Sequence, residues 1–231
     1  MTLVKVCGLR RSQDVDAAVG LGAWAVGFIL TESPRKVTVA AAARLAARVG
    51  RGVLTVAVFT TERAGEIVAA VAETGVRAVQ LSAGAHGPSV PAVRAAISAA
   101  GLPEPALIAA RDARGLNEAD FILYDTRHAD AGYVQFGGTG RTLDWNAVAA
   151  LPRRGRVVLA GGIGPENARV AIRRVAPLAI DVCSSVEVSP GVKDLDRLSA
   201  LFATVRSADA APERAASDDE HRGRPTRKGA T

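Results

Sequence analysis

Cys7 ends the first apolar segment of the chain, and its thiol is the first side chain whose chemistry could serve catalysis. In a parallel α/β fold, the residue that ends a strand lies at the edge where active sites form. Cys7 is therefore either an inert core thiol or a catalytic base. Lys5 projects from the same face of the strand and needs an anionic partner. Asp181, in the last apolar segment, is the expected partner if the first and last strands pair.

A glycine cluster gives the clearest local signal for ligand binding. Gly161 and Gly162 follow an apolar segment, and a helix is expected to begin at Pro165. Glycine lets the backbone approach an anion closely and point its N–H groups at it. Ser184 and Ser185, after the last apolar segment, add hydroxyl and N–H donors. These four residues predict a phosphate site.

Other polar residues also follow apolar segments. Asp125 ends the sixth segment, so its carboxylate is expected near a pocket, with a turn cap as the alternative. The guanidinium of Arg35 could hold a carboxylate through two hydrogen bonds, or it could simply be exposed. Gln80 lies at the end of the fourth segment. Gly138 belongs to a long loop that contains residues 136–141. The glycines of this loop suggest mobility or close approach to a ligand, and its length is typical of a lid.

Eight apolar segments must position these residues, and most lack polar alternation, as strands buried on both faces do. The predicted strands are Leu3–Cys7, Ala25–Leu30, Val53–Phe59, Ala78–Leu81, Ala106–Ala109, Phe121–Tyr124, Arg156–Ala160 and Ala179–Cys183.

Helical patterns separate most of these strands, and the fifth connection is too short to assign. The predicted helices are Ser12–Leu21, Val39–Val49, Glu62–Glu73, Val90–Ala99, Asp144–Ala149, Pro165–Val175 and Lys193–Val205. Eight β-α units predict an α/β protein with a single-domain (β/α)8 TIM barrel over residues 1–206. A doubly wound open sheet is the runner-up, but the first strand lacks the glycine fingerprint of dinucleotide binding. Residues 207–231 have no aliphatic periodicity and predict a disordered tail.

Composition limits the classes of function. The net charge is +6 and the pI about 10.0. Basic residues are scattered without aromatic interleaving, so we expect no nucleic-acid partner and favour a small anionic substrate. No apolar run of about 18 residues or signal pattern appears, so no membrane association is expected. Two cysteines give no disulfide framework, which favours a reduced, cytoplasmic protein.

An ordered set of motifs is more specific than any single one. The set comprises Lys5–Gly8, Gly27–Leu30, Ser33–Arg35, Val56–Phe59, Val79–Leu81, Asp125, Gly137–Gly140, Asp144-Trp145, Leu159–Gly162, Asp181-Val182, Val186-Glu187 and Pro190–Asp194. In this order, the motifs resemble the phosphoribosylanthranilate isomerase family of tryptophan biosynthesis, over about residues 3–206.

The resemblance implies a (β/α)8 barrel with no metal and no organic cofactor, acting as a monomer or homodimer. It implies conversion of N-(5-phosphoribosyl)anthranilate to 1-(2-carboxyphenylamino)-1-deoxyribulose 5-phosphate by an Amadori rearrangement. It assigns Cys7 as the base and Asp125 as the acid. It also assigns Arg35 to the anthranilate carboxylate and the glycine and serine loops to the phosphate. The remaining predicted substrate-binding residues are Lys5, Gln80, Gly138 and Asp181.

Three departures from the family pattern leave alternatives open. Ser82-Ala83 stand where the family commonly has His-Gly, Ser185 where it usually has Gly, and Arg10 where Thr is common. A histidine-pathway or dual-substrate aminoaldose isomerase is one alternative, although that family typically has Asp where this chain has Cys7. A catalytically silent phosphate-binding barrel is another.

The two cysteines suggest one more hypothesis. If the first and eighth strands are neighbours, Cys7 and Cys183 lie near the same edge of the barrel. A Cα separation within about 7 Å would let oxidation join them and block the base.

Overall fold

Eight parallel strands close into a barrel in the order β1-β10-β9-β6-β5-β4-β3-β2. The structure is a computed structural model that describes residues 1–60, 62–125, 134–135, 141–142, 145–149 and 154–210. The barrel strands are β1 Leu3–Val6, β2 Ala25–Ile29, β3 Leu54–Phe59, β4 Ala78–Leu81, β5 Ala106–Ala110, β6 Phe121–Tyr124, β9 Val157–Leu159 and β10 Ala179–Val182. The predicted (β/α)8 barrel is confirmed, and each predicted strand agrees to within a residue or so at either end.

Strand residues alternate between two apolar layers, as the period of two requires. One cluster, which includes Val56, Val58 and Ile108, fills the barrel interior. The other, which includes Phe28 and Phe59, packs between the strands and the helices. Because both faces are covered, the strands are almost wholly apolar, and the few polar interior positions stand out.

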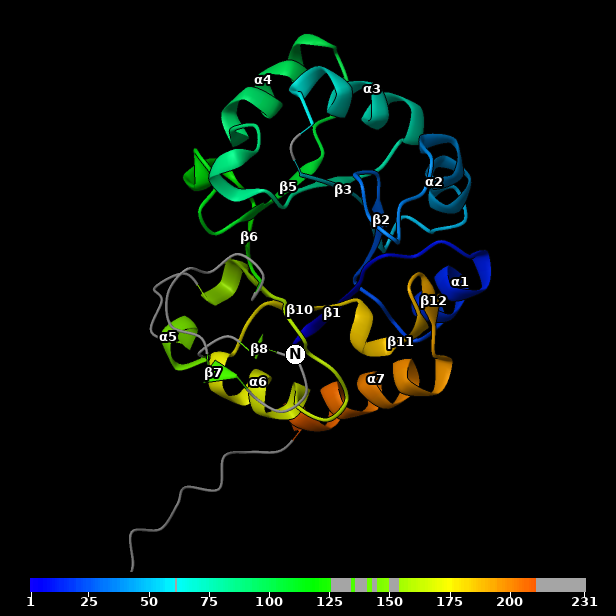
Figure 1. Cartoon of the computed structure of the whole chain (residues 1–231), viewed down its shortest axis with the longest axis vertical. Helices are drawn as coiled ribbons and strands as arrows, with labels where there is room; N and C mark the ends of the chain where they lie inside the picture. The colour runs from blue at the N-terminus through cyan, green and yellow to red at the C-terminus, as the bar shows by residue number, and fades with distance from the viewer. Residues whose placement is uncertain (61, 126–133, 136–140, 143–144, 150–153, 211–231) are drawn as a thin grey trace, which may run out of the picture.

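Helices form a ring outside the strands, and both ends of the ring meet where α7 packs beside α1 and α6 (Figure 1). The helices are α1 Ser12–Gly20, α2 Val39–Ala46, α3 Ala64–Thr74, α4 Val90–Ala99, α5 Trp145–Ala149, α6 Ala168–Val175 and α7 Leu195–Ala210. The unassigned fifth connection contains a 3₁₀ turn, η2 Leu116–Glu118. None of the helices described is long and apolar enough to cross a membrane.

Three helix starts differ from the predictions by two or three residues. Helix α3 begins at Ala64 rather than Glu62. Helix α6 begins at Ala168 rather than Pro165, because the Asn167 side chain accepts from the Gly164 N–H and donates to the Gly162 carbonyl. These bonds close a turn ahead of the helix. Lys193 does not begin a helix either. It lies in an antiparallel hairpin of β11 Glu187–Ser189 and β12 Val192–Lys193.

The end of the barrel domain also needs correction. Helix α7 continues to Ala210, so residues 207–210 are helical and do not belong to the predicted tail. Residues 211–231 lie outside the described residues. A second short hairpin, β7 Val134–Gln135 with β8 Arg141–Thr142, flanks the glycine-rich loop. Gly138 itself also lies outside the described residues.

Candidate active site

Lys5 and Asp181 form a buried ion pair beneath Cys7. The parallel register places Lys5 opposite Asp181, so both side chains project into the barrel at one level. Lys5 is completely buried, and its Nζ donates to Asp181 Oδ2 at 2.7 Å. The predicted pairing is therefore confirmed. Lys5 lies two residues before Cys7 and projects from the same face of β1, so the ion pair lies directly below the thiol inside the barrel.

The surroundings of Cys7 favour its thiolate. A hydrogen bond with the Cys183 side chain is the largest effect and lowers the pKa of Cys7 well below its usual value. Burial opposes this, while the positive charges of Lys5 and Lys193 add to it. Gly27 on β2 makes room for the sulfur, because a Cβ at that position would lie 2.9 Å from Cys7 Sγ.

Asp181 has an unusual environment for a carboxylate. Burial raises the pKa of Asp181 to about 7, the charges of Cys7 and Asp125 act in the same direction, and Lys5 opposes them. Burial also disfavours the Lys5 ammonium, but the charges of Asp181 and Cys7 outweigh it and raise the pKa of Lys5. Lys5 therefore stays charged, whereas Asp181 titrates near neutral pH.

Arg35 is held in a network that the sequence did not suggest. Its Nε donates to both carboxylate oxygens of Glu187, at 3.1 and 2.9 Å, and its Nη2 donates to Oε2 at 2.8 Å. Lys193 Nζ donates to Glu187 Oε1 at 2.9 Å and to the Cys183 carbonyl at 3.0 Å. Although burial favours the neutral acid, these cations lower the pKa of Glu187. Glu187 thus fixes both cations beside the strand that carries Cys183.

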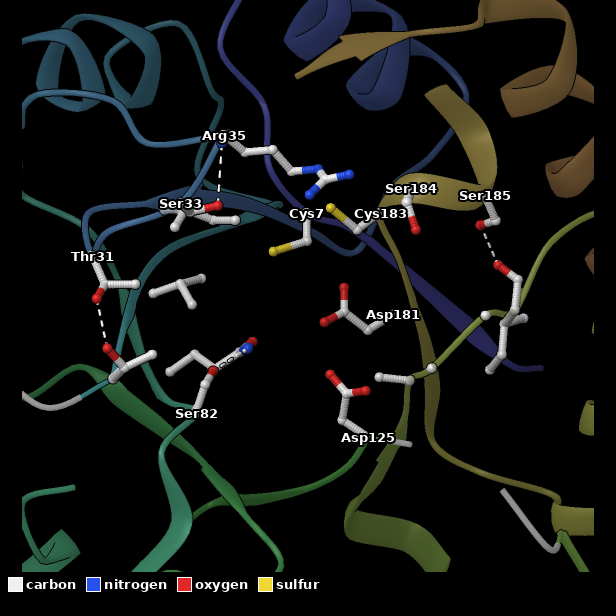
Figure 2. A pocket seen from close by; sticks show the side chains of 18 of the residues that line it. Cys7, Thr31, Ser33, Arg35, Ser82, Asp125, Asp181, Cys183, Ser184 and Ser185 are labelled. Carbon is white, nitrogen blue, oxygen red and sulfur yellow. Dashed lines mark hydrogen bonds between the residues drawn. The ribbon is translucent and has the colours of Figure 1, made fainter. Parts of the chain in front are cut away.

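Asp125, after β6, and Gln80, on β4, also line the pocket, and Figure 2 shows Asp125 beside Asp181. Asp125 follows β6 and is buried with its carboxylate near that of Asp181. The Gln80 amide donates to Ser82 Oγ at 2.9 Å. Among the described residues, no hydrogen-bond partner exists for two buried acceptors, Gln80 Oε1 and Asp181 Oδ1. Such acceptors are costly unless a ligand or water supplies a donor.

The glycine and serine loops form one wall of the same pocket. Gly161 and Gly162 have φ values of 93° and 69°, a left-handed conformation that favours glycine. Ser184 and Ser185 lie in a 3₁₀ turn, η5 Ser184–Val186, and the Ser185 hydroxyl bonds to the Ile163 carbonyl. The two loops are therefore joined directly at the end of the barrel that carries Cys7.

The described strand ends enclose an open cavity of about 360 Å³. Its size suits a small-molecule ligand. The thiols of Cys7 and Cys183 line one side of the cavity and the carboxylates of Asp125 and Asp181 another (Figure 2). The glycine and serine loops form a further wall. This arrangement can supply a base, an acid and an anion site to one substrate.

Comparison with known proteins gives the family. The family model described as N-(5'phosphoribosyl)anthranilate (PRA) isomerase matches residues 4–204. The chain belongs to this isomerase family. A curated N-(5'-phosphoribosyl)anthranilate isomerase of Herminiimonas arsenicoxydans is 36% identical, over 91% of this chain and 95% of the relative. That of Dechloromonas aromatica is 38% identical, over 90% and 98%.

Solved structures of the PRA isomerase family agree with this assignment. TrpF from Jonesia denitrificans has a TM-score of 0.74 and 32% identity, covering 90% of this chain and 98% of its own. Another phosphoribosyl anthranilate isomerase has a TM-score of 0.70 and 32% identity, covering 90% and 100%. That structure holds reduced 1-(o-carboxyphenylamino)-1-deoxyribulose 5-phosphate.

Most of the predicted site residues of this PRA isomerase family member lie together. The cavity is lined by Cys7, Arg35, Gln80, Asp125, Gly161, Gly162, Asp181, Ser184 and Ser185. Lys5 lies below the lining and reaches the site only through Asp181 and Cys7. Gly138 lies outside the described residues.

Sequence reasoning missed the contributions of Glu187 and Lys193. The cations that lower the pKa of Cys7 are Lys5 and Lys193, and the sequence placed only Lys5 near the thiol. The signal for the placement of Lys193 was present, because Pro190-Gly191 between two short segments is typical of a hairpin turn. A hairpin folds Lys193 back over Cys183, whereas the predicted helix start would not.

Proposed function

We propose that this chain converts N-(5'-phosphoribosyl)anthranilate to 1-(2-carboxyphenylamino)-1-deoxyribulose 5-phosphate in tryptophan biosynthesis. The observation that carries the proposal is one cavity that holds a thiol poised as thiolate, Cys7, together with a buried carboxyl group, Asp125, in a chain of this family. The reaction moves protons within the substrate, so an acid and a base suffice for it.

Asp125 is the proposed acid. Protonated, it donates to the furanose ring oxygen, which breaks the bond between C1 and that oxygen and opens the ring. The nitrogen lone pair then forms an iminium with C1. The ring oxygen leaves as a hydroxyl group, so no charge is left on it. The donation needs the neutral carboxyl form, and Asp125 is buried at the cavity.

Cys7 is the proposed base. Its thiolate removes the proton from C2, and the electrons of that C–H bond neutralise the iminium to give an enolamine. The enolamine then gains a proton at C1 and loses the proton of the C2 hydroxyl, which gives the ketone. A thiol of ordinary pKa is only a few per cent thiolate near pH 7, so the lowered pKa of Cys7 raises the fraction of active base.

Separate groups are proposed to bind the phosphate and the ribose of the substrate. The backbone at Gly161 and Gly162, with Ser184 and Ser185, binds the phosphate, because a left-handed glycine pair can turn its N–H groups toward an anion. Asp181 Oδ1 and Gln80 Oε1 accept hydrogen bonds from the ribose hydroxyls, which supplies the donors that these buried atoms need.

The guanidinium of Arg35 is the proposed partner of the anthranilate carboxylate. Glu187 binds its Nε and Nη2 edge and fixes the plane of the group at the cavity rim. A fixed guanidinium loses little freedom when it binds a carboxylate. Glu187 therefore serves this proposed role by orienting Arg35. We also propose a reducing, cytoplasmic location, where Cys7 and Cys183 stay free.

The test is turnover by the purified full chain. N-(5'-phosphoribosyl)anthranilate is generated in the assay, and its consumption is followed by the change in anthranilate fluorescence. The histidine-pathway aminoaldose is assayed in parallel by absorbance. We expect turnover of the anthranilate substrate alone. Turnover of both compounds would indicate a dual-substrate enzyme, and turnover of neither would refute the proposal.

A further inference from the structure

Cys183 is a second thiol in the cavity that the proposed reaction does not use. It follows β10 just as Cys7 follows β1, and these two strands pair with Val6 opposite Val182. The Cys7 N–H donates to the Val182 carbonyl at 2.8 Å, so the pairing continues to the strand ends. Paired strands lie about 4.8 Å apart, and the two thiols therefore sit side by side (Figure 2).

The position of the Cys183 sulfur is restricted by its neighbours. Gly8 has a φ of 73°, and a Cβ there would lie 2.9 Å from Cys183 Sγ, so the sulfur packs directly over this glycine. Lys193 Nζ bonds to the Cys183 carbonyl at 3.0 Å and fixes the backbone. The thiol is thus held against the first strand, next to Cys7.

Among the described residues, Glu187 competes with Cys7 as acceptor for the Cys183 proton. Glu187 Oε1 lies 3.9 Å from Cys183 Sγ, a long contact. That oxygen already accepts from Arg35 at 3.1 Å, from Gly191 N–H at 3.2 Å and from Lys193 at 2.9 Å. The Cys7 thiolate is therefore the better acceptor for the Cys183 proton.

The charges around the two sulfurs agree with this direction of donation. The interaction lowers the pKa of Cys7 and raises the pKa of Cys183, so Cys7 ionises first and Cys183 keeps its proton. The charged and titratable groups that act on the pair are Lys5 on β1, Asp181 on β10, Glu187 on β11 and Lys193 on β12. Asp125, after β6, acts on Asp181, and the Arg35 side chain packs over Gly8 beside the Cys183 sulfur.

We propose that Cys183 is a positioning residue for the base: its S–H donates to the Cys7 thiolate and holds that sulfur at the cavity wall. The role in catalysis rests on the proposed function, because it presumes that Cys7 is the base. The hydrogen bond itself does not depend on the substrate. A single donor of this kind stabilises the thiolate relative to the thiol by about tenfold.

The chain has two cysteines, so each single replacement leaves one thiol to observe. Cys183→Ala removes the donor, Cys183→Ser keeps one, and Cys7→Ala leaves Cys183 alone. Thiolate formation is titrated from pH 4 to 11 by absorbance near 240 nm, with circular dichroism at each pH to confirm folding. We expect Cys7 in the Cys183→Ser variant to ionise at nearly the same pH as the first of the two thiols to ionise in the wild type. At the pH where that variant is half ionised, the ratio of thiolate to thiol in Cys183→Ala should be about tenfold lower.

Activity provides the second readout. In the plot of kcat/KM against pH, the rise on the acid side should move to higher pH in Cys183→Ala and stay in place in Cys183→Ser. KM should change little in either variant. Coincident titrations of the Ala and Ser variants would overturn the proposal. So would a Cys7→Ala protein in which Cys183 ionises at lower pH than Cys7 does in Cys183→Ser. Because the titration needs no substrate, failure of the proposed function would show separately, as an absence of turnover.

Discussion

Lys5 Nζ lies 2.7 Å from Asp181 Oδ2 inside the barrel, where Asp181 lines the cavity and Lys5 lies beneath that lining. Removing one member of a buried pair leaves an uncompensated charge. We expect Asp181→Leu to lower the free energy of unfolding by about 3–5 kcal/mol, measured by urea denaturation. The double variant Lys5→Met with Asp181→Leu removes both charges and should recover most of that loss. A single Asp181→Leu variant as stable as the wild type would show that the pair does not stabilise the charge of Lys5.

The same pair predicts a dependence of stability on pH. The pKa of Asp181 is raised from 3.8 to about 7 in the folded state, so folding favours its protonated form. Its contribution to stability is fully present below pH 4 and is lost as pH rises through 7. The raised pKa of Lys5 also stabilises the fold, and this contribution to the unfolding free energy is constant below pH 10.

Unfolding free energies of two proteins isolate this effect. Both carry Cys7→Ala, which removes the titration of the thiol, and one also carries Lys5→Met with Asp181→Leu. The stability of the protein that keeps the pair, minus that of the protein without it, should fall between pH 4.5 and 8. A difference that stays constant or rises would mean that the pKa of Asp181 is not raised.

Gly27 should be essential for placing the base. A Cβ on Gly27 would lie 2.9 Å from Cys7 Sγ and 3.3 Å from Cys7 Cα, so the Cys7 side chain must move in Gly27→Ala. Small displacements of a catalytic group are costly, and we expect kcat to fall by about tenfold to a hundredfold. Gly65→Ala, on helix α3 with no atom within 4 Å, is the matched control and should keep wild-type turnover. Unchanged turnover in both variants would place the reactive sulfur elsewhere.

Oxidation should join Cys7 to Cys183. The spacing of paired strands falls within the Cα separation of about 4.4–6.8 Å that disulfides require. Hydrogen peroxide oxidises the Cys7 thiolate to a sulfenic acid, and the Cys183 thiol then displaces water from that sulfur. The two thiols lose two electrons in total, and one peroxide is reduced to two waters.

Intact mass and thiol titration follow this reaction. We expect loss of both free thiols, a mass lower by two hydrogens, and a loss of turnover that dithiothreitol reverses. The Cys183→Ser variant has no partner for the sulfenic acid and should instead gain oxygen on Cys7. A wild-type protein that also gains only oxygen atoms would rule out the direct bridge.

The barrel could be predicted from the sequence because its strands are buried on both faces. Segments such as Leu54–Phe59 are short, apolar and separated by helical patterns, and eight of them leave few topologies. Helix starts were less accurate. Pro165 is a good first-turn residue, but the side chain of Asn167 closes a turn ahead of the helix. The local preference at Pro165 did not reveal that competing hydrogen bond.

The candidate site was predictable where its residues lie in or at the ends of barrel strands, and unpredictable where it depends on contacts between residues outside those strands. Closure of the barrel brings Lys5 to Asp181, and the alternation of strand residues aims both inward. The ion pair of Arg35 with Glu187 joins residues 152 positions apart through two loops. No periodicity or spacing indicates that contact, because neither residue lies in a barrel strand.

Turnover of N-(5'-phosphoribosyl)anthranilate by the Cys7→Ala and Asp125→Ala variants tests the central claim most directly. Each variant should fold like the wild type by circular dichroism and lose about a hundredfold or more in kcat, since each lacks one proton-transfer group. Asp16→Asn, which alters an exposed surface pair with Arg48, should keep full activity. Near-wild-type turnover in either the Cys7→Ala or the Asp125→Ala variant would contradict the assignment of Cys7 as base and Asp125 as acid.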